Sequence, residues 1–522
     1  MTHHMKPYIT RDEPFGPIDS TDIDLRDVDT LEKLFEEHNR IYRHLHQRPS
    51  IIMGRKGSGK TSYLRTVYFD GEYDFHTEIR TDHALTHISK VLQDTVKDAV
   101  FPEMLAEVWE TILWICVLSE LRRHDFLPPD VLKKVDAYLE KTGVQNAGSM
   151  DDIFWKLASL FDRAVEAGQK EGLAEILRLF DRAAFKSTAA QVEDCLRRAD
   201  KKFVILMDSL DDFQLDFDSV SYSIQGLLKF VGSMNKPRDV VDIRFCLPTE
   251  LYRRIIKISS NPNKDFRRSL KLQWTASELI LIGAQRLKMY LELYYPEFLK
   301  NLLPLDPAVR ADALKLFNAV LPRTVTNHAG FQEETIAYIL RHTQLLPRHF
   351  LILLNSIFKS TGGTQGLHPF PVSEARILNG IRQVEERIVT EIFVAFKLIH
   401  PTAEDVCKRC IPELGHKFSM GELHRVYTRK GKTVFDGENL FEFRRMLLEI
   451  GALGRVKLGK ATDIYIQGNF EYTVEHEIAV SHEDELCIHP LFSGIFGSDS
   501  KDRPVYPYGS DLDGEDYRDN FG

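Results

Sequence analysis

A short stretch near the start of the sequence has the residue types and the spacing of a phosphate-binding loop. Residues 50–61 read Ser-Ile-Ile-Met-Gly-Arg-Lys-Gly-Ser-Gly-Lys-Thr, which contains the pattern G-x-x-x-x-G-K-[ST]. Glycines let the backbone turn sharply and bring its N–H groups up to phosphate oxygens. The lysine of this pattern reaches the β- and γ-phosphates, and the final hydroxyl ligates Mg²⁺. The residues that we expect to hold the phosphates are Gly54, Arg55, Lys56, Gly57, Ser58, Gly59, Lys60, Thr61 and Ser62.

The residues on either side of the loop agree with this reading. Residues 50–53 form a short, mostly apolar run, which is typical of a buried parallel strand. Residues 61–68 are expected to form the helix that the loop opens, and the first turn of a helix adds partial positive charge that favours an anion. The context therefore predicts a catalytic role for Lys60 beside the phosphates and a metal-ligating role for Thr61.

A second stretch, at residues 201–212, supplies acidic side chains. Five apolar residues end there on Asp208. A buried parallel strand with an acid at its carboxyl end is where a carboxylate for Mg²⁺ belongs in an open α/β sheet, so Asp208 is expected to hold the metal through water. Asp211 and Asp212 follow on the next turn, close enough to polarise an attacking water. The sequence leaves open which of these two acids is the base.

Two later segments are expected to respond to the γ-phosphate. The apolar run 240–247 predicts another strand, and Thr249 or Glu250 just after it is a candidate sensor. Pro347 and Arg348 lie at the start of a helical pattern that covers residues 350–358. An arginine at this place can reach the γ-phosphate and report its presence; the alternative is a capping or surface role.

The predicted fold class is an α/β P-loop NTPase, built on a parallel sheet with a helical insertion and followed by an all-α lid bundle and a winged-helix domain. A chain of 522 residues is expected to form about three domains. Three helical patterns and a hairpin pattern near the carboxyl end indicate the winged helix. The expected boundaries are an N-terminal arm (1–29), an ATPase core (30–270) with a helical insertion at about 122–200, a helical lid (271–400), a winged helix (401–496) and a disordered acidic tail (497–522).

The net charge of −9 is concentrated in two segments. Residues 10–37 carry a net −7 and residues 498–522 a net −4, so the rest of the chain is near neutral and bulk charge does not exclude contact with nucleic acid. Residues 412–470 hold 10 bases against 7 acids, fewer bases than a dedicated DNA-binding face usually has. We therefore expect weak DNA binding at most, and packing of the winged helix on the ATPase body, on a second copy of the chain or on a partner protein. The basic residues on or beside the two helices that normally meet DNA in this motif are Arg425, Arg429, Lys430, Lys432, Arg444 and Arg445.

The cysteine usage and the lack of long apolar runs indicate the cytoplasm and no association with a membrane. No run approaches the roughly 20 apolar residues of a membrane helix, and the amino-terminal end lacks a signal pattern. The six cysteines are mostly scattered, as in a reducing compartment. Cys407 and Cys410 form a lone C-x-x-C, which without a second pair indicates two helical residues one turn apart rather than a zinc site.

These motifs resemble those of bacterial AAA-like and STAND-type P-loop ATPases, the signal-transduction ATPases with numerous domains. The resemblance spans roughly residues 30–496. It is carried by the Gly54–Thr61 loop, the strand ending in Asp208-Ser-Leu-Asp-Asp, the lid with Pro347-Arg348 and the winged helix. It implies a nucleotide-driven conformational or oligomeric switch in bacterial stress or antiviral defence. The sequence departs from the family at Asp212, where glutamate is commoner and reaches further toward water.

Two alternatives to a regulatory ATPase remain. One is a winged-helix DNA-binding ATPase that acts in replication, transposition or repair. The other is a P-loop kinase, which the lid and the winged helix disfavour because kinases of this fold are typically short single domains. ATP is expected rather than GTP because the sequence lacks a guanine-specific N/T-K-x-D element. The expected ligands are thus ATP and Mg²⁺.

Overall fold

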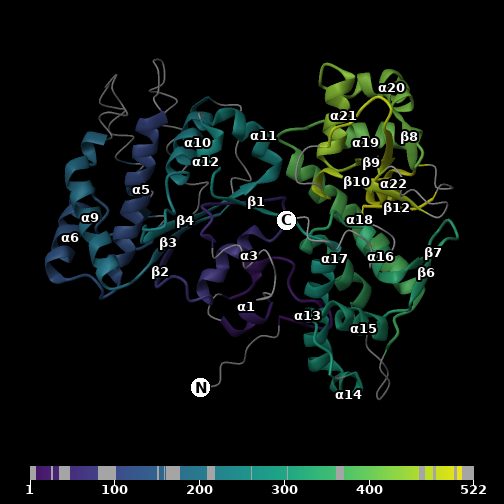
Figure 1. Cartoon of the computed structure of the whole chain (residues 1–522), viewed down its shortest axis with the longest axis horizontal. Coiled ribbons are helices and arrows are strands. Elements are labelled where there is room, and N and C mark those ends of the chain that lie inside the picture. Colours follow the sequence, from purple (N-terminus) through teal and green to yellow (C-terminus); the bar gives the residue numbers. More distant parts are fainter. Residues whose placement is uncertain are drawn as a thin grey trace. The chain divides into compact units, whose positions relative to one another are not determined.

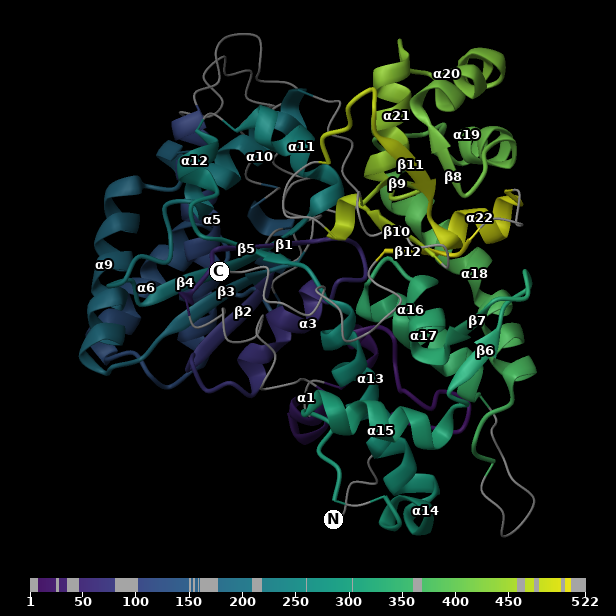
Figure 2. The same ribbon diagram turned by 45° about the vertical axis from the view of Figure 1, so that its right-hand side comes forward.

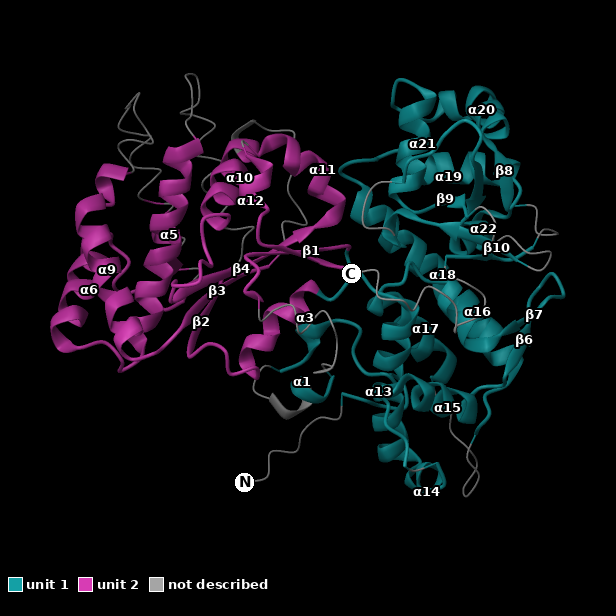
Figure 3. Ribbon diagram, in the orientation of Figure 1, with its two compact units in different colours: residues 1–39, 56–59, 273–522 teal, residues 40–55, 60–272 magenta. Residues whose placement is uncertain are grey.

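A computed structural model describes most of the chain in two compact units (Figure 3). Unit 1 comprises residues 1–39, 56–59 and 273–522, and unit 2 comprises residues 40–55 and 60–272. The residues described are 8–24, 28–34, 47–79, 102–149, 152–153, 155–157, 159, 177–208, 218–259, 261–302, 304–359, 369–457, 465–473, 478–498 and 503–507.

Unit 2 is built on a five-stranded, wholly parallel sheet in the order β2-β3-β4-β1-β5 (Figure 1). The strands are β1 (Ile51–Gly54), β2 (Phe75–Ile79), β3 (Phe203–Met207), β4 (Val241–Pro248) and β5 (Ser269–Leu272). Every residue of β1, β3 and β4 is buried, which explains their near-continuous apolar sequences. Because all five strands run the same way, their carboxyl ends meet at one edge of the sheet. The expected parallel sheet is confirmed.

Helices surround this sheet. They are α3 (Lys60–Leu64), the 3-10 helix η3 (Arg65–Tyr68), α5 (Pro102–Arg123), α6 (Pro129–Lys141), α9 (Arg182–Arg198), α10 (Asp218–Val231), α11 (Thr249–Ile258) and α12 (Pro262–Asp265). The described part of the segment between β2 and β3 contains α5, α6 and α9 and is helical, as expected. Helix α5 packs on α10, and the Trp109 indole N–H donates to the Ser223 carbonyl at 2.9 Å.

Unit 1 contains the helical lid, whose helices are seen from a second side in Figure 2. They are α13 (Ala276–Tyr294), α14 (Pro296–Lys300), α15 (Arg310–Val320), α16 (Thr335–Arg341), α17 (Pro347–Phe358) and α18 (Glu374–Phe396). Thr275 and Glu278 form a reciprocal capping box that begins α13. The lid is not purely helical, because β6 (Thr324–Thr326) and β7 (Gln332–Glu334) form a short antiparallel hairpin.

The winged helix follows the lid in the same unit. Its helices are α19 (Ala403–Cys410), α20 (Met420–Arg429), α21 (Leu440–Glu449) and α22 (Pro490–Phe496), and its strands are β8 (Lys417–Ser419), β9 (Leu453–Val456), β10 (Ile466–Asn469), β11 (Glu485–Ile488) and β12 (Val505–Tyr506). The sheet order is β12-β10-β9-β11-β8, with the wing hairpin formed by β9 and β10. The predicted winged helix is confirmed, although β8, β11 and β12 were not expected. Cys407 and Cys410 lie buried on α19, and both thiols are free.

Three predictions at segment boundaries need correction. The expected core boundary at residue 270 falls inside β5, so the sheet extends to Leu272. The tail is not wholly disordered, since Val505 and Tyr506 are buried and pair in parallel with β10. The N-terminal arm includes a turn of 3-10 helix, η1 (Ser20–Asp22), and helix α1 (Val28–Leu34) begins within its predicted limits.

Candidate nucleotide-binding site

The phosphate loop leaves β1 and enters α3, as its sequence predicts. Strand β1 lies between β4 and β5 and runs parallel to both. Because the loop follows the last residue of β1, it starts at the carboxyl edge of the sheet. Gly57 and Gly59 have φ angles of 85° and 90°. These values lie in the left-handed region that glycine adopts without strain. Gly57 is not part of the defining pattern, yet its backbone needs glycine as much as Gly59 does.

Lys60 extends back across the start of its own loop. Its ammonium donates to the carbonyl oxygens of Gly54 at 3.0 Å and Arg55 at 3.2 Å, and the residue is buried. The carbonyls of the loop therefore hold the ammonium group within the loop. Arg55, Lys56, Thr61 and Ser62 are half-buried.

Thr61 and Asp208 are brought together from residues far apart in the sequence. The Thr61 hydroxyl donates to Asp208 Oδ2 at 2.9 Å. Thr61 follows the loop on β1, and Asp208 is the first residue after β3, so both lie at the carboxyl edge of the sheet. These two side chains were predicted to ligate Mg²⁺. Mg²⁺ takes hydroxyl and carboxylate oxygens as ligands, and water and phosphate oxygens would complete its octahedral shell.

The other predicted site residues of the core differ in how they are placed. Asp211 and Asp212 lie outside the described residues. Thr249 and Glu250 begin α11 at the carboxyl end of β4, and β4 lies between β1 and β3. The strand order therefore places the two candidate sensors between the loop strand and the strand of Asp208.

An acid that the sequence analysis did not select lies at the same edge. Glu78 is near the carboxyl end of β2, next to β3. Partial desolvation raises the pKa of the Glu78 carboxyl, the Arg65 guanidinium lowers it, and the Asp208 carboxylate raises it again. Glu78 and Asp208 thus lie near the carboxyl ends of two neighbouring strands. No sequence signal marked Glu78, which stands between Thr77 and Ile79 as an ordinary solvent-facing strand residue would.

Two residues of the lid contact the middle of the loop within unit 1. The Trp274 indole N–H donates to the Ser58 carbonyl at 2.9 Å, and both residues are buried. The Arg348 backbone N–H donates to the Gly57 carbonyl at 3.3 Å. Arg348 is the second residue of α17, as expected. The lid thus fixes two successive carbonyls of the loop, and Trp274 is a contact that the sequence analysis missed.

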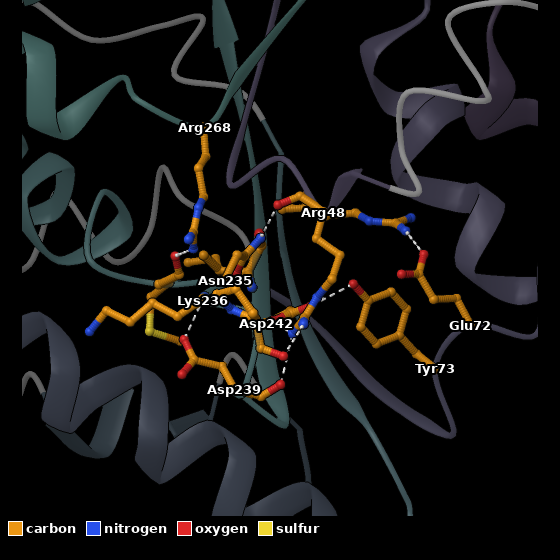
Figure 4. Close-up of polar contacts among 12 residues, drawn as sticks. Arg48, Glu72, Tyr73, Asn235, Lys236, Asp239, Asp242 and Arg268 are labelled. Atoms are coloured by element: carbon orange, nitrogen blue, oxygen red, sulfur yellow. Dashed lines mark hydrogen bonds and ion pairs between the residues drawn. The ribbon is translucent and has the colours of Figure 1, made fainter.

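The amino-terminal side of the sheet carries a buried charge network that the sequence analysis also missed (Figure 4). Asp242 of β4 accepts from Arg48 at 2.6 Å and from the Tyr73 hydroxyl at 2.8 Å. Arg244, two residues on and fully buried, donates to Glu72 at 3.0 Å and to the Thr66 hydroxyl at 3.0 Å. Alternation places Asp242 and Arg244 on one face of β4. The network anchors β4 to the segment after the loop helix and lies at the opposite edge from the phosphate loop.

Taken together, the sheet, the loop and the pair formed by Thr61 and Asp208 decide the fold class. The chain has the P-loop NTPase fold. In the described part of the chain, no helix is long and apolar enough to cross a bilayer, and no group of three or more His, Cys, Asp or Glu side chains could hold a metal ion.

Comparison with known proteins does not assign a family. The sequence matches no known protein family and no curated protein. Among solved structures, the ORC2 protein of Aeropyrum pernix in its ADPNP–ADP complexes is 12% identical, with a TM-score of 0.35 over 90% of this chain and 93% of that chain. Its ADP form is 11% identical, with a TM-score of 0.29 over 91% and 96%. CDC6p of Pyrobaculum aerophilum is 10% identical, with a TM-score of 0.28 over 93% and 96%. Likeness at this level establishes no relationship, so the fold class rests on the sheet and the loop.

Proposed function

We propose that the chain is an ATP-binding and ATP-hydrolysing regulatory ATPase whose nucleotide state controls its conformation or its assembly with other copies. The observation that carries this proposal is the 2.9 Å hydrogen bond from Thr61 to Asp208. These residues are 147 positions apart, and both were predicted to hold the same metal ion. Their meeting at the carboxyl edge of a parallel sheet, directly after a phosphate loop, is the arrangement that MgATP requires.

The loop residues take defined roles in this proposal. Lys60 exchanges the carbonyls of Gly54 and Arg55 for oxygens of the β- and γ-phosphates, a charge-assisted interaction. Thr61 and Asp208 hold Mg²⁺, which when bound neutralises the charge of the phosphates. The N–H groups between Gly54 and Thr61 bind the remaining phosphate oxygens. Positioning and electrostatic stabilisation account for most of catalysis in phosphoryl transfer.

Water activation and sensing are assigned to further residues. Asp212, or Asp211 beside it, is the proposed base that orients the attacking water. Arg348 is the proposed sensor of the γ-phosphate, supported by its backbone contact with Gly57. The site selects ATP because a triphosphate presents more negative charge to Arg348 than a diphosphate does.

The regulatory part of the proposal is supported by how the lid segment before Arg348 is tied to the winged helix. The Gln344 side-chain N–H donates to the Ile450 carbonyl at 2.8 Å, and His489 Nε2 lies 3.2 Å from the Thr343 carbonyl. Leu345, next in the chain, has a φ of 48°, which is strained for leucine. One short segment thus contacts the phosphate loop at its end and the winged helix at its start, all within unit 1. A change at Arg348 would be passed to the winged helix through it.

The compartment and the biological role are also proposals. All six cysteines are free thiols, which supports a reducing cytoplasm. We place the switch in bacterial stress or antiviral defence, on the resemblance of its motifs alone. A second copy of the chain or another protein is the expected partner.

DNA is the partner in the second candidate function, which the winged-helix domain itself favours. Helix α21 carries Arg444 and Arg445, at the position that meets DNA in this motif. Four of the six basic residues named for these helices have acids beside them, however. Arg429 and Lys430 both contact Glu413, at 2.5 and 2.6 Å, and the acids beside Arg425 and Arg445 are Glu422 and Glu449. Acids so placed repel a phosphate backbone, so a protein-contacting role fits the charges better.

Measurement of phosphate release tests the proposed activity. The purified chain should hydrolyse ATP with Mg²⁺ and stop when EDTA removes the metal. Thr61→Ala should lower the rate by about 10²-fold or more, because it removes a metal ligand. Hydrolysis that is independent of Mg²⁺, or a Thr61→Ala variant as active as the wild type, would exclude this site as the catalytic one.

A further inference from the structure

The N-terminal arm is anchored to the lid by a buried aromatic ring and by hydrogen bonds on both sides of it. Phe15 is fully buried and packs edge-on against Phe358 of α17, with ring centroids 5.2 Å apart. Asn355 of α17 accepts from the Phe15 N–H at 2.7 Å and donates to the Gly16 carbonyl at 2.9 Å. The arm is therefore a fixed part of the lid surface rather than a free tail.

A half-buried arginine of α13, Arg286, strengthens this anchor. Arg286 donates to the carbonyls of Phe15 at 2.7 Å and Pro17 at 2.9 Å. Burial lowers the pKa of its guanidinium to about 10, so the group remains charged at neutral pH. Charged donors on backbone carbonyls make strong hydrogen bonds. The backbone just before Asp19 is thus fixed with respect to α13 and α17.

Asp19 uses its two carboxylate oxygens for different tasks. Oδ1 accepts from the backbone N–H of Thr21 at 3.0 Å and from its hydroxyl at 2.9 Å, which caps the 3-10 turn η1. Oδ2 accepts from Arg348 Nη2 at 2.6 Å. The turn therefore holds the carboxylate in place, with its second oxygen facing the arginine.

Arg348 itself lies against the phosphate loop. Its N–H donates to the Gly57 carbonyl at 3.3 Å, and its Cβ would be 3.1 Å from a Cβ added at Gly57. The side chains of Arg348 and Asp19 are 23% and 37% exposed, so solvent screens their ion pair only in part. The backbone of Arg348 thus lies beside the loop, and its guanidinium is already paired with the Asp19 carboxylate.

We propose that Asp19 sets how strongly the site prefers a triphosphate, by competing with the terminal phosphate for the Arg348 guanidinium. This inference rests on the proposed function, in which Arg348 senses the γ-phosphate. A carboxylate and a phosphate on one guanidinium repel each other, and the carboxylate reduces the net charge that the phosphate meets. Asp19 thereby keeps the preference for ATP over ADP moderate, which lets the protein return to its starting conformation after hydrolysis.

Asp19→Asn tests the proposal because it removes the charge and keeps an oxygen for the Thr21 cap. We would measure the affinities of MgADP and of a non-hydrolysable β,γ-imido ATP analogue with Mg²⁺ by calorimetry. The ratio of the two affinities should rise about threefold to tenfold in Asp19→Asn, less than a fully buried charged hydrogen bond would give because solvent screens the pair. Asp22→Asn is the matched control, since Asp22 is an exposed acid of the same turn, and its ratio should equal that of the wild type.

The same substitution made in the Arg348→Ala variant shows whether Asp19 acts on the affinity ratio through Arg348. In Arg348→Ala, the further change Asp19→Asn should leave the affinity ratio unchanged, because the shared partner has gone. An unchanged or lower ratio in Asp19→Asn alone, or the same rise in both backgrounds, would overturn the proposal. Failure of the wild type to bind either nucleotide would instead overturn the proposed function.

Discussion

Replacement of Gly57 by alanine perturbs the backbone of the phosphate loop and removes no functional group. Gly57 has a φ of 85°, and a left-handed backbone costs a residue with a Cβ roughly 1–2 kcal/mol. The added methyl would also lie 3.1 Å from Arg348 Cβ and 3.3 Å from its Cδ, closer than ordinary van der Waals contact. The loop can relax by moving away from its phosphate-binding shape. Binding must then restore that shape, so we expect MgATP to bind roughly 5- to 30-fold more weakly to Gly57→Ala.

A matched glycine separates this effect from general loss of stability. Gly71 has a φ of 66°, and nothing lies within 4 Å of a Cβ added there. Gly71→Ala should therefore lower the thermal denaturation midpoint, because its backbone strain is similar to that of Gly57→Ala. It should leave the affinity for MgATP at the wild-type value. Calorimetric titration and thermal denaturation of both variants are the assays. Wild-type affinity in Gly57→Ala, or an equal loss of affinity in Gly71→Ala, would refute the link between this backbone conformation and phosphate binding.

Two further predictions concern the acids and the winged helix. Asp208→Asn should weaken both the dependence on Mg²⁺ and hydrolysis itself, whereas Asp212→Asn should keep nucleotide binding and lower turnover by about 10²–10⁴-fold. A turnover defect in Asp211→Asn alone would move the base by one residue, and wild-type rates in both acid variants would indicate a binding switch without hydrolysis. In an electrophoretic shift series from about 50 to 200 mM salt, DNA binding should be weak and fall steeply. Sub-micromolar, sequence-selective binding that survives the higher salt and disappears in Arg444→Ala/Arg445→Ala would favour the DNA-acting alternative.

The central strands could be predicted because their sequences carry the reason for their burial. Strands β1, β3 and β4 are buried throughout and read as apolar runs. Strand β5 was missed because its four residues, Ser-Leu-Lys-Leu, alternate and only Leu272 is buried. The charged pair Asp242 and Arg244 was missed within β4, since an apolar run gives no sign that two of its residues meet partners from the segments just before β1 and β2.

The candidate site could be predicted where a motif and a sheet rule both apply. The motif selects Thr61, and the rule that parallel strands end at one edge selects Asp208, so their contact follows. Trp274 and Asp19 could not be predicted, because their contacts with Ser58 and Arg348 span 216 and 329 residues and depend on lid packing that no local pattern encodes. Asp211 and Asp212 lie outside the described residues, and their roles stay predictions.

The most direct test of the central claim is a calorimetric titration of MgATP into the wild type and Lys60→Ala. Lys60 supplies the cation beside the β- and γ-phosphates, and the loop carbonyls of Gly54 and Arg55 hold it in place. A hydrogen bond to a charged group contributes about 1.5–3 kcal/mol, so the variant should bind roughly 10- to 150-fold more weakly. Lys133→Ala, at an exposed lysine of α6, should bind as the wild type does. Equal affinity in the wild type and Lys60→Ala would contradict the assignment of this loop as the nucleotide site.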